Sequence, residues 1–308
     1  MKIPRIFSLA AALFAAAAGS APAAPTAADL RAIGCTVVER DGQIAEIRAE
    51  ANDFTAAEYR LIGGCASLKK LSLNGKTLTD ETLPLLAGLT ALEELSTNGS
   101  ALSDGGYRGF AALKNLRVLH LWHPSWNLPS FTGAGIAHLK ALPKLERLTF
   151  AGSTAGDAAL EAVGQLSQLE HFQTWHTRQT AAGNAHLAKL ANLTSLRIGQ
   201  RLPKGPDSPP SFDGSAIPIF AKLPALEKLE IFEAVLTADD LMPLKEAASL
   251  QSLRIHTTEI SPEDVEALRK ALPGVKIDFD PITAEDRAAT LGKKLKLLPA
   301  PAAPVPND

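Results

Sequence analysis

The sequence predicts an α/β solenoid in which a parallel sheet lines the concave face and helices cover the convex face. Two observations carry this prediction. Apolar residues recur at a fixed interval, so that Leu68, Leu92 and Leu116 are each 24 residues apart. Within each interval the apolar spacing changes from every second residue to every third or fourth, which indicates a strand followed by a helix. Because such a unit cannot bury its apolar side alone, successive units must stack on one another.

Nine units and a closing strand fit this interval over residues 44–280. Most units are 24 residues long, and those that begin at Leu116 and Leu193 are longer by five and nine residues. Helix starts carry capping signals, such as Thr55 three residues before Glu58. The first apolar positions of the nine units are Ile44, Leu68, Leu92, Leu116, Leu145, Leu169, Leu193, Leu226 and Leu250.

Three segments carry a resemblance to a known family: LKKLSLNGKTLTDETL, LEELSTNGSALSDGGY and LEKLEIFEAVLTADDL. Each has the pattern of a short leucine-rich strand, a polar turn and an acidic helix start. The pattern resembles the leucine-rich-repeat superfamily in its β-α form, akin to ribonuclease inhibitor, and above all short bacterial repeats with Leu-Thr-Asp helix starts. The resemblance implies a right-handed horseshoe. It implies a shared binding surface rather than a shared chemistry.

The N-terminal residues 1–23 are expected to be a secretory signal peptide. Basic Lys2 and Arg5 precede an apolar stretch, and Ala-Pro-Ala at 21–23 offers a cleavage site. A retained N-terminal anchor helix is the alternative. Cleavage would leave an exported protein, periplasmic or extracellular, with no membrane insertion.

Both ends of the repeat array are expected to carry caps. Residues 24–43 are predicted to be an N-terminal cap, with a short helix and a hairpin turn at Asp41-Gly42. Residues 281–297 are predicted to be a C-terminal cap helix. The proline-rich residues 298–308 are predicted to be a disordered tail.

The chain has two cysteines, Cys35 and Cys65. Cys65 takes an inward helix-end position that leucine fills in other units, and Cys35 precedes the cap strand. Because export would allow disulfides to persist, we expect a Cys35–Cys65 disulfide that staples the N-terminal cap. Two small buried thiols are the alternative.

Three departures from the repeat fall close together, and functional sites are where local rules tend to fail. The two long units extend the loops at residues 122–132 and 199–213, which leave the same end of their strands. Strands are about 4.8 Å apart, so three steps predict a cleft roughly 15 Å wide between these loops. Two units lie between them, and the one that begins at Leu169 has polar Thr174, Gln179 and Asn184 where other units usually have apolar residues. They are expected to form a bracing polar network, and the alternatives are a register shift that exposes them or harmless sequence drift.

The concave strand residues near this cleft are rich in aromatic, arginine and histidine side chains, which are typical of binding hot spots. The alternative is that Trp126, together with Trp122, packs the long loops onto the sheet. On either side the concave face is expected to be a solvated sheet surface, with Phe232 and His256 as isolated exceptions. The predicted ligand-binding residues are His120, Trp122, Trp126, Arg147, Thr149, His171, Gln173, Trp175, His176 and Arg197.

Other functions find little support in the sequence. The formal net charge of −2 favours no nucleic-acid partner. His120, His123, His171 and His176 match no zinc spacing, and we expect no metal and no cofactor. No catalytic motif appears, so no catalytic residue is assigned. We expect a monomeric module that binds a protein or peptide. A carbohydrate-binding module is the alternative, and a metal-dependent or hydrolytic enzyme is a remote one.

Overall fold

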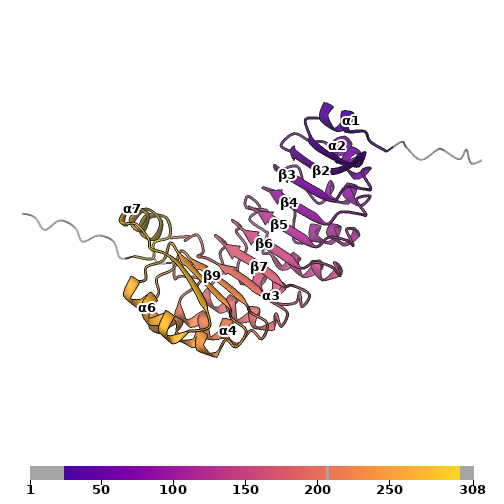
Figure 1. Ribbon diagram of the computed structural model, residues 1–308. Coiled ribbons are helices and arrows are strands. Elements are labelled where there is room, and N and C mark those ends of the chain that lie inside the picture. Colours follow the sequence, from indigo (N-terminus) through magenta and orange to yellow (C-terminus); the bar gives the residue numbers. More distant parts are fainter. Residues whose placement is uncertain (1–23, 206–207, 299–308) are drawn as a thin grey trace, which may run out of the picture.

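The computed structural model describes residues 24–205 and 208–298, so the predicted signal peptide (1–23) and nearly all of the predicted tail (299–308) lie outside the described residues. The described chain forms an arc, with the strands along its inner side and helices along its outer side (Figure 1). The α/β solenoid predicted from the repeat is confirmed. None of the described helices is both long enough and apolar enough to cross a membrane.

One sheet of eleven strands runs through the described part of the chain, in sequence order from β1 to β11. The first pair is antiparallel, and every later pair is parallel. The strands are β1 (Thr36–Arg40), β2 (Gln43–Glu50), β3 (Lys70–Asn74), β4 (Glu94–Asn98), β5 (Val118–Trp122), β6 (Arg147–Ala151), β7 (His171–Trp175), β8 (Ser195–Ile198), β9 (Lys228–Phe232), β10 (Ser252–His256) and β11 (Lys276–Asp280).

The parallel strands pair in the register that the repeat predicts. Leu71, Leu95 and Leu119 are consecutive partners across β3, β4 and β5. All three are at most 2% exposed, because they point from the sheet into the core. The residues between them therefore point to the concave face, as alternation along a strand requires.

The outer side carries helical segments that are mostly short. The α-helices are α1 (Ala27–Ala32), α2 (Ala56–Gly63), α3 (Asp157–Val163), α4 (Ile217–Ala221), α5 (Ala238–Leu241), α6 (Pro262–Ala271) and α7 (Ala284–Asp286). The 3₁₀ helices are η1 (Leu83–Leu86), η2 (Gly106–Ala112), η3 (Ala134–Ala141), η4 (Ala181–Lys189), η5 (Gly214–Ala216) and η6 (Met242–Glu246), and η7 (Arg287–Lys294) is a π-helix. The 3₁₀ form rises further per residue, so few residues span the outer side of a 24-residue repeat.

The acidic residue at many helix starts has a different role from the one that the sequence indicates. Thr55 and Glu58 form the predicted capping box. Asp80, by contrast, accepts hydrogen bonds from the backbone N–H (2.9 Å) and hydroxyl (2.5 Å) of Ser103 in the next repeat. Asp104 and Asp157 accept the same pair of bonds from Thr132 and Thr180. These carboxylates therefore link neighbouring repeats.

The predicted disulfide is wrong. Cys35 and Cys65 are free thiols, 5% and 4% exposed, and they belong to the core beneath the N-terminal cap. Burial, followed by the proximity of Cys35, raises the pKa of Cys65 to about 11. Both thiols pack as small apolar side chains, which was the alternative interpretation.

Candidate functional site on the concave face

A continuous row of aromatic rings runs along the concave face at the carboxyl ends of the strands. Trp122 on β5 meets Trp175 on β7 with ring centroids 5.5 Å apart, and Trp175 meets Phe232 on β9 at 5.5 Å. Phe232 stacks on His256 of β10 at 5.2 Å, with the ring planes 1° apart. We call Trp122, Trp175, Phe232 and His256 the aromatic row. Such ring contacts stabilise one another and keep the rings in fixed orientations.

Small residues on the intervening strands allow these rings to touch. Ala151 on β6 pairs with both Trp122 and Trp175, so the two indoles meet above its methyl group. Gly199 follows β8, and a β-carbon at this position would lie 2.6 Å from the Phe232 ring. Each contact in the row between Trp122 and Phe232 therefore passes over a strand that contributes almost no side chain.

Arg197 on β8 connects the row to charged residues. Its guanidinium carbon lies 4.7 Å from the Trp175 ring centroid and 4.9 Å from that of Phe232. Its Nε is 3.2 Å from a Glu230 carboxylate oxygen, although the group is not aligned for a hydrogen bond. The same oxygen lies 2.9 Å from Nε2 of His256. Cation–π contacts with both rings, together with the Glu230 carboxylate, hold Arg197 against the row.

His120 continues the surface on β5. Its ring stacks on Trp122 at 6.1 Å, and its Nδ1 is 2.8 Å from the buried Thr149 hydroxyl. Burial lowers the pKa of His120, with a smaller contribution from the charge of Arg147. The neutral imidazole is therefore favoured, and the group presents an aromatic face rather than a charge.

A hollow of about 250 Å³ lies beside the row, near the amino ends of the same strands. Arg147, Leu148, Thr149, His171, Gln173, Ser195 and Lys228 line it. Burial, followed by the positive charge of Arg147, lowers the pKa of His171. All of the lining residues come from β6, β7, β8 and β9, and none comes from the loops 122–132 and 199–213 that were predicted to bound a cleft.

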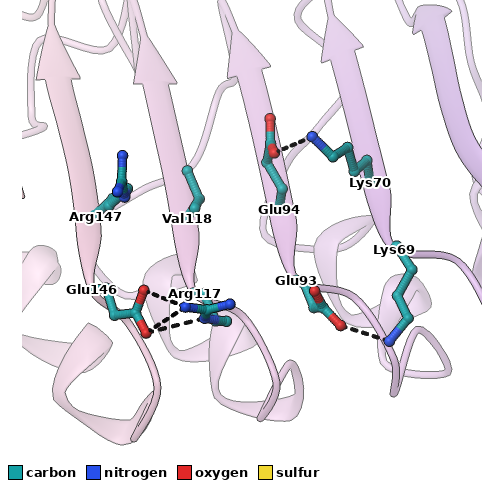
Figure 2. Close-up of a pocket in the computed structure, with 8 residues that line it drawn as sticks. All are labelled: Lys69, Lys70, Glu93, Glu94, Arg117, Val118, Glu146 and Arg147. Carbon is teal, nitrogen blue, oxygen red and sulfur yellow. Dashed lines mark hydrogen bonds and ion pairs between the residues drawn. The ribbon is translucent and has the colours of Figure 1, made fainter.

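A neighbouring hollow towards the N-terminal end is largely neutralised by ion pairs. Figure 2 shows Lys69 paired with Glu93, Lys70 with Glu94, and Arg117 with Glu146, while Arg147 lies apart from these pairs. Its volume is about 260 Å³. Because its charges already have partners, this hollow offers few free groups to a ligand.

His176 belongs to a separate cluster at the carboxyl edge of the sheet. Its Nε2 lies 2.8 Å from one Glu233 oxygen, and Lys294 of η7 lies 3.2 Å from the other. Glu233 is only 5% exposed. Burial would raise the pKa of Glu233, but the hydrogen bond from His176 and the charges of His176 and Lys294 lower it on balance. This cluster fastens the C-terminal segment to the sheet.

Neither a family model nor a curated protein matches the sequence. Among solved structures, the chain is similar to internalin C2 of Listeria monocytogenes, with 19% identity, a TM-score of 0.43, and coverage of 82% of this chain and 83% of that one. It is also similar to a leucine-rich-repeat protein of Leptospira interrogans, with 19% identity, a TM-score of 0.39, and coverage of 71% of this chain and 62% of that one. A TLR13–ssRNA13 complex gives 17% identity, a TM-score of 0.44, and coverage of 71% and 37%.

The chain is a leucine-rich-repeat solenoid. Its leucine positions are buried and paired in register along a parallel sheet, as described above. The likeness to these solved structures concerns the fold, and the chain spans less than two thirds of the Leptospira protein. The ligand of this solenoid has to be inferred from its own concave face.

The two long loops of the solenoid pack against the body. In the first loop, the Ser125 hydroxyl donates to the Leu102 carbonyl at 2.5 Å, and buried Phe131 stacks on Tyr107 at 5.7 Å. Trp126 is 58% exposed and has no ring partner among the described residues. Of the three tryptophans, Trp126 is therefore the one that lies outside the aromatic row.

The second loop is tied to the polar unit before it. Asn184 donates to the Ser211 carbonyl at 2.8 Å, and the Thr177 hydroxyl donates to Gln179 at 2.7 Å. Thr174, Gln179 and Asn184 are all buried, which supports the bracing network over a register shift. Buried Arg201 donates to carbonyls of its own loop and to Leu295 at 2.8 Å, so the C-terminal segment covers this loop.

The ten predicted ligand-binding residues thus fall into four places. The hollow is lined by Arg147, Thr149, His171 and Gln173. The aromatic row contains Trp122 and Trp175 and is contacted by His120 and Arg197. His176 fastens the C-terminal segment, and Trp126 lies apart from the other nine. Sequence reasoning missed Phe232 and His256 as members of the row and Lys228 as a lining residue. Among the described residues, no group of three or more histidine, cysteine or acidic side chains could hold a metal ion.

Proposed function

We propose that this solenoid is an exported recognition module that binds a protein or peptide on its concave face. The observation that carries the proposal is the aromatic row, in which Trp122, Trp175 and His256 are half-exposed on the sheet surface and Phe232, 6% exposed, packs between Trp175 and His256. Rigid aromatic and arginine side chains provide large contact area with little loss of conformational entropy on binding.

The arrangement of the row favours an elongated ligand. The rings span β5 to β10, five strand spacings, which corresponds to roughly 24 Å along the sheet. An extended peptide of about seven residues covers this length. Arg197 would then contact the ligand between the indole of Trp175 and the ring of Phe232.

A displayed library of random twelve-residue peptides, screened alongside a glycan array, tests the proposal. We expect peptide hits on the wild-type protein. The variant Gln173→Tyr should weaken them by at least about tenfold, because a bulky side chain at this half-exposed position obstructs the face without entering the core. Trp126→Ala is the matched control and should bind within about twofold of the wild type, since Trp126 lies outside the row.

The outcomes separate the candidates. Hits that bind Gln173→Tyr as well as wild type would place binding elsewhere on the molecule and overturn the proposal. Hits confined to the glycan array would favour the carbohydrate-binding alternative, in which the exposed faces of the tryptophans stack on sugars.

A further inference from the structure

The hollow beside the aromatic row collects positive charge from both of its sides. Arg147, His171, Ser195 and Lys228 are consecutive partners across β6, β7, β8 and β9. Three strand spacings put the backbones of Arg147 and Lys228 about 14 Å apart. Between them lie the shorter side chains of His171 and Ser195, and all four residues line the hollow.

These two cations have no acidic partner. Among residues 24–205 and 208–298, no carboxylate oxygen lies within 4.0 Å of the Arg147 or Lys228 side-chain nitrogens. Of the nearby acids, Glu146 pairs with Arg117 and Glu230 with Arg197, whereas Glu170 has no ion-pair partner among the described residues and no cation of the hollow within 4.0 Å. Two exposed cations would ordinarily be solvated surface groups, so their charge alone assigns nothing.

The floor of the hollow supplies the second observation. The side chains of His171, Gln173 and Ser195 are half-buried and make no side-chain hydrogen bond within the described chain. After the larger effect of burial, the charges of Arg147 and Lys228 lower the pKa of His171, while those of Glu170 and Glu146 oppose them, and the pKa is lowered on balance. Half-buried groups that can donate hydrogen bonds and are surrounded by unpaired cations form a receptor for an anion.

We propose that this hollow binds a side-chain or terminal carboxylate of an acidic peptide segment, held between Arg147 and Lys228 and hydrogen-bonded by Gln173 and Ser195. The proposal rests on the recognition function proposed above and adds the chemical class of the ligand. Strands β7 and β9 carry a residue of the hollow at their amino ends and a residue of the row at their carboxyl ends, and these two ends are about 13 Å apart. An extended ligand would therefore carry an acidic residue about four positions from an aromatic or apolar one.

The first experiment uses glutarate, a small dicarboxylate, and needs no peptide. The ring resonances of His171 are assigned with His171→Gln and followed by NMR as glutarate is added. We expect a saturable shift of the His171 signals. The double variant Arg147→Gln, Lys228→Gln should weaken glutarate binding by about tenfold or more, because both charge-assisted contacts are lost.

Arg254→Gln is the matched control for charge. Arg254 is also an exposed cation on the concave face, but Asp280 lies 3.4 Å away and already pairs with it. Glutarate affinity should change by less than about twofold in this variant. A glutarate response that is absent in the wild type, or equal in the double variant and the wild type, would overturn the anion receptor.

The second experiment compares peptide libraries selected on the wild type and on the double variant. Aspartate and glutamate should be enriched at least about twofold among wild-type hits and should return to the library frequency in the double variant. Peptide hits without acidic enrichment would overturn this inference while leaving peptide recognition intact. A glutarate response without any peptide hit would leave the anion receptor intact and would overturn the proposed peptide recognition.

Discussion

Replacing Glu233 by glutamine should weaken the attachment of the C-terminal segment and lower the free energy of unfolding. The Glu233 carboxylate lies 2.8 Å from His176 Nε2 and 3.2 Å from Lys294 Nζ. Glutamine keeps the size of the side chain and the same backbone conformation, at a φ of 57°. The substitution therefore removes the charge without relieving or adding backbone strain.

The two contacts differ in value because their partners differ in exposure. A hydrogen bond to a charged group contributes about 1.5–3 kcal/mol when it is buried. The His176 contact falls in this range, because the His176 side chain is 20% exposed and that of Glu233 only 7%. The Lys294 side chain is 45% exposed, so solvent screening reduces the contribution of its ion pair with Glu233 to the free energy of unfolding to about 0.5 kcal/mol. We expect a total loss of about 2 kcal/mol.

Urea unfolding at pH 7 measures this loss, and Glu259→Gln provides the control. Glu259 pairs with Arg287 of the same segment at 2.5 Å, but both side chains are at least a third exposed. That variant should lose less than about 0.5 kcal/mol. Hydrogen exchange of η7 should accelerate in Glu233→Gln and change little in Glu259→Gln.

The effect should also depend on pH with a definite sign. Because the pKa of Glu233 is lowered in the folded protein, its contribution is present above the unfolded value of about 4.3 and is lost as the pH falls through the folded value. The stability gap between wild type and Glu233→Gln should therefore close below about pH 4. A gap below 0.5 kcal/mol at pH 7, or one that is undiminished at pH 3, would refute the reasoning.

Three further predictions concern the scaffold. Gly75→Ala should lower the free energy of unfolding by about 3 kcal/mol, because a β-carbon would lie 2.4 Å from a backbone oxygen of the preceding repeat at a φ of +127°. Gly42→Ala is the control, has open space around it and should lose only about 1 kcal/mol. Equal losses for the two variants in thermal unfolding would contradict this account. A thiol reagent should find two reactive thiols in unfolded, unreduced protein. It should react slowly with the native protein at pH 7, because burial raises the pKa values of Cys35 and Cys65. Fewer than two thiols in the unfolded protein would mean that a disulfide forms. Iodide should quench the fluorescence of Trp126, which is 58% exposed, most strongly, so Trp126→Phe should remove most of the quenchable signal.

The sequence predicted the scaffold well because the repeat interval is a direct consequence of stacking. Each leucine that recurs at the interval is buried against its equivalent in the next unit, so spacing in the sequence becomes register in the sheet. The strand positions, the hairpin at Asp41-Gly42 and the capping box at Thr55 all follow from such local signals.

The candidate site was predicted less completely because its contacts skip a strand. Phe232 seemed isolated in the sequence, since its neighbour on β8 carries no aromatic residue. The structure brings it to Trp175 over Gly199, where only a hydrogen occupies the space. A small residue at the matched position between two aromatic residues is the signal that would have found this contact.

Two other differences arise from contacts distant in sequence. The loop at 199–213 looked like a free wall of a cleft, but Arg201 holds the carbonyl of Leu295, 94 residues further along the chain. No periodic pattern encodes such a pair. The cysteines have suitable burial for a structural role, yet nothing in their spacing distinguishes a disulfide from two packed thiols.

The strand-skipping contacts also bear on how the array unfolds. In most repeat proteins each unit is coupled only to its immediate neighbours, so stability behaves as a one-dimensional chain of nearest-neighbour terms. The contacts from Trp122 to Trp175 and from Trp175 to Phe232 add second-neighbour terms over β5–β9. These five repeats should therefore melt as a single cooperative block. The N-terminal repeats should fray independently, because no aromatic contact skips a strand in the part of them that the structure describes.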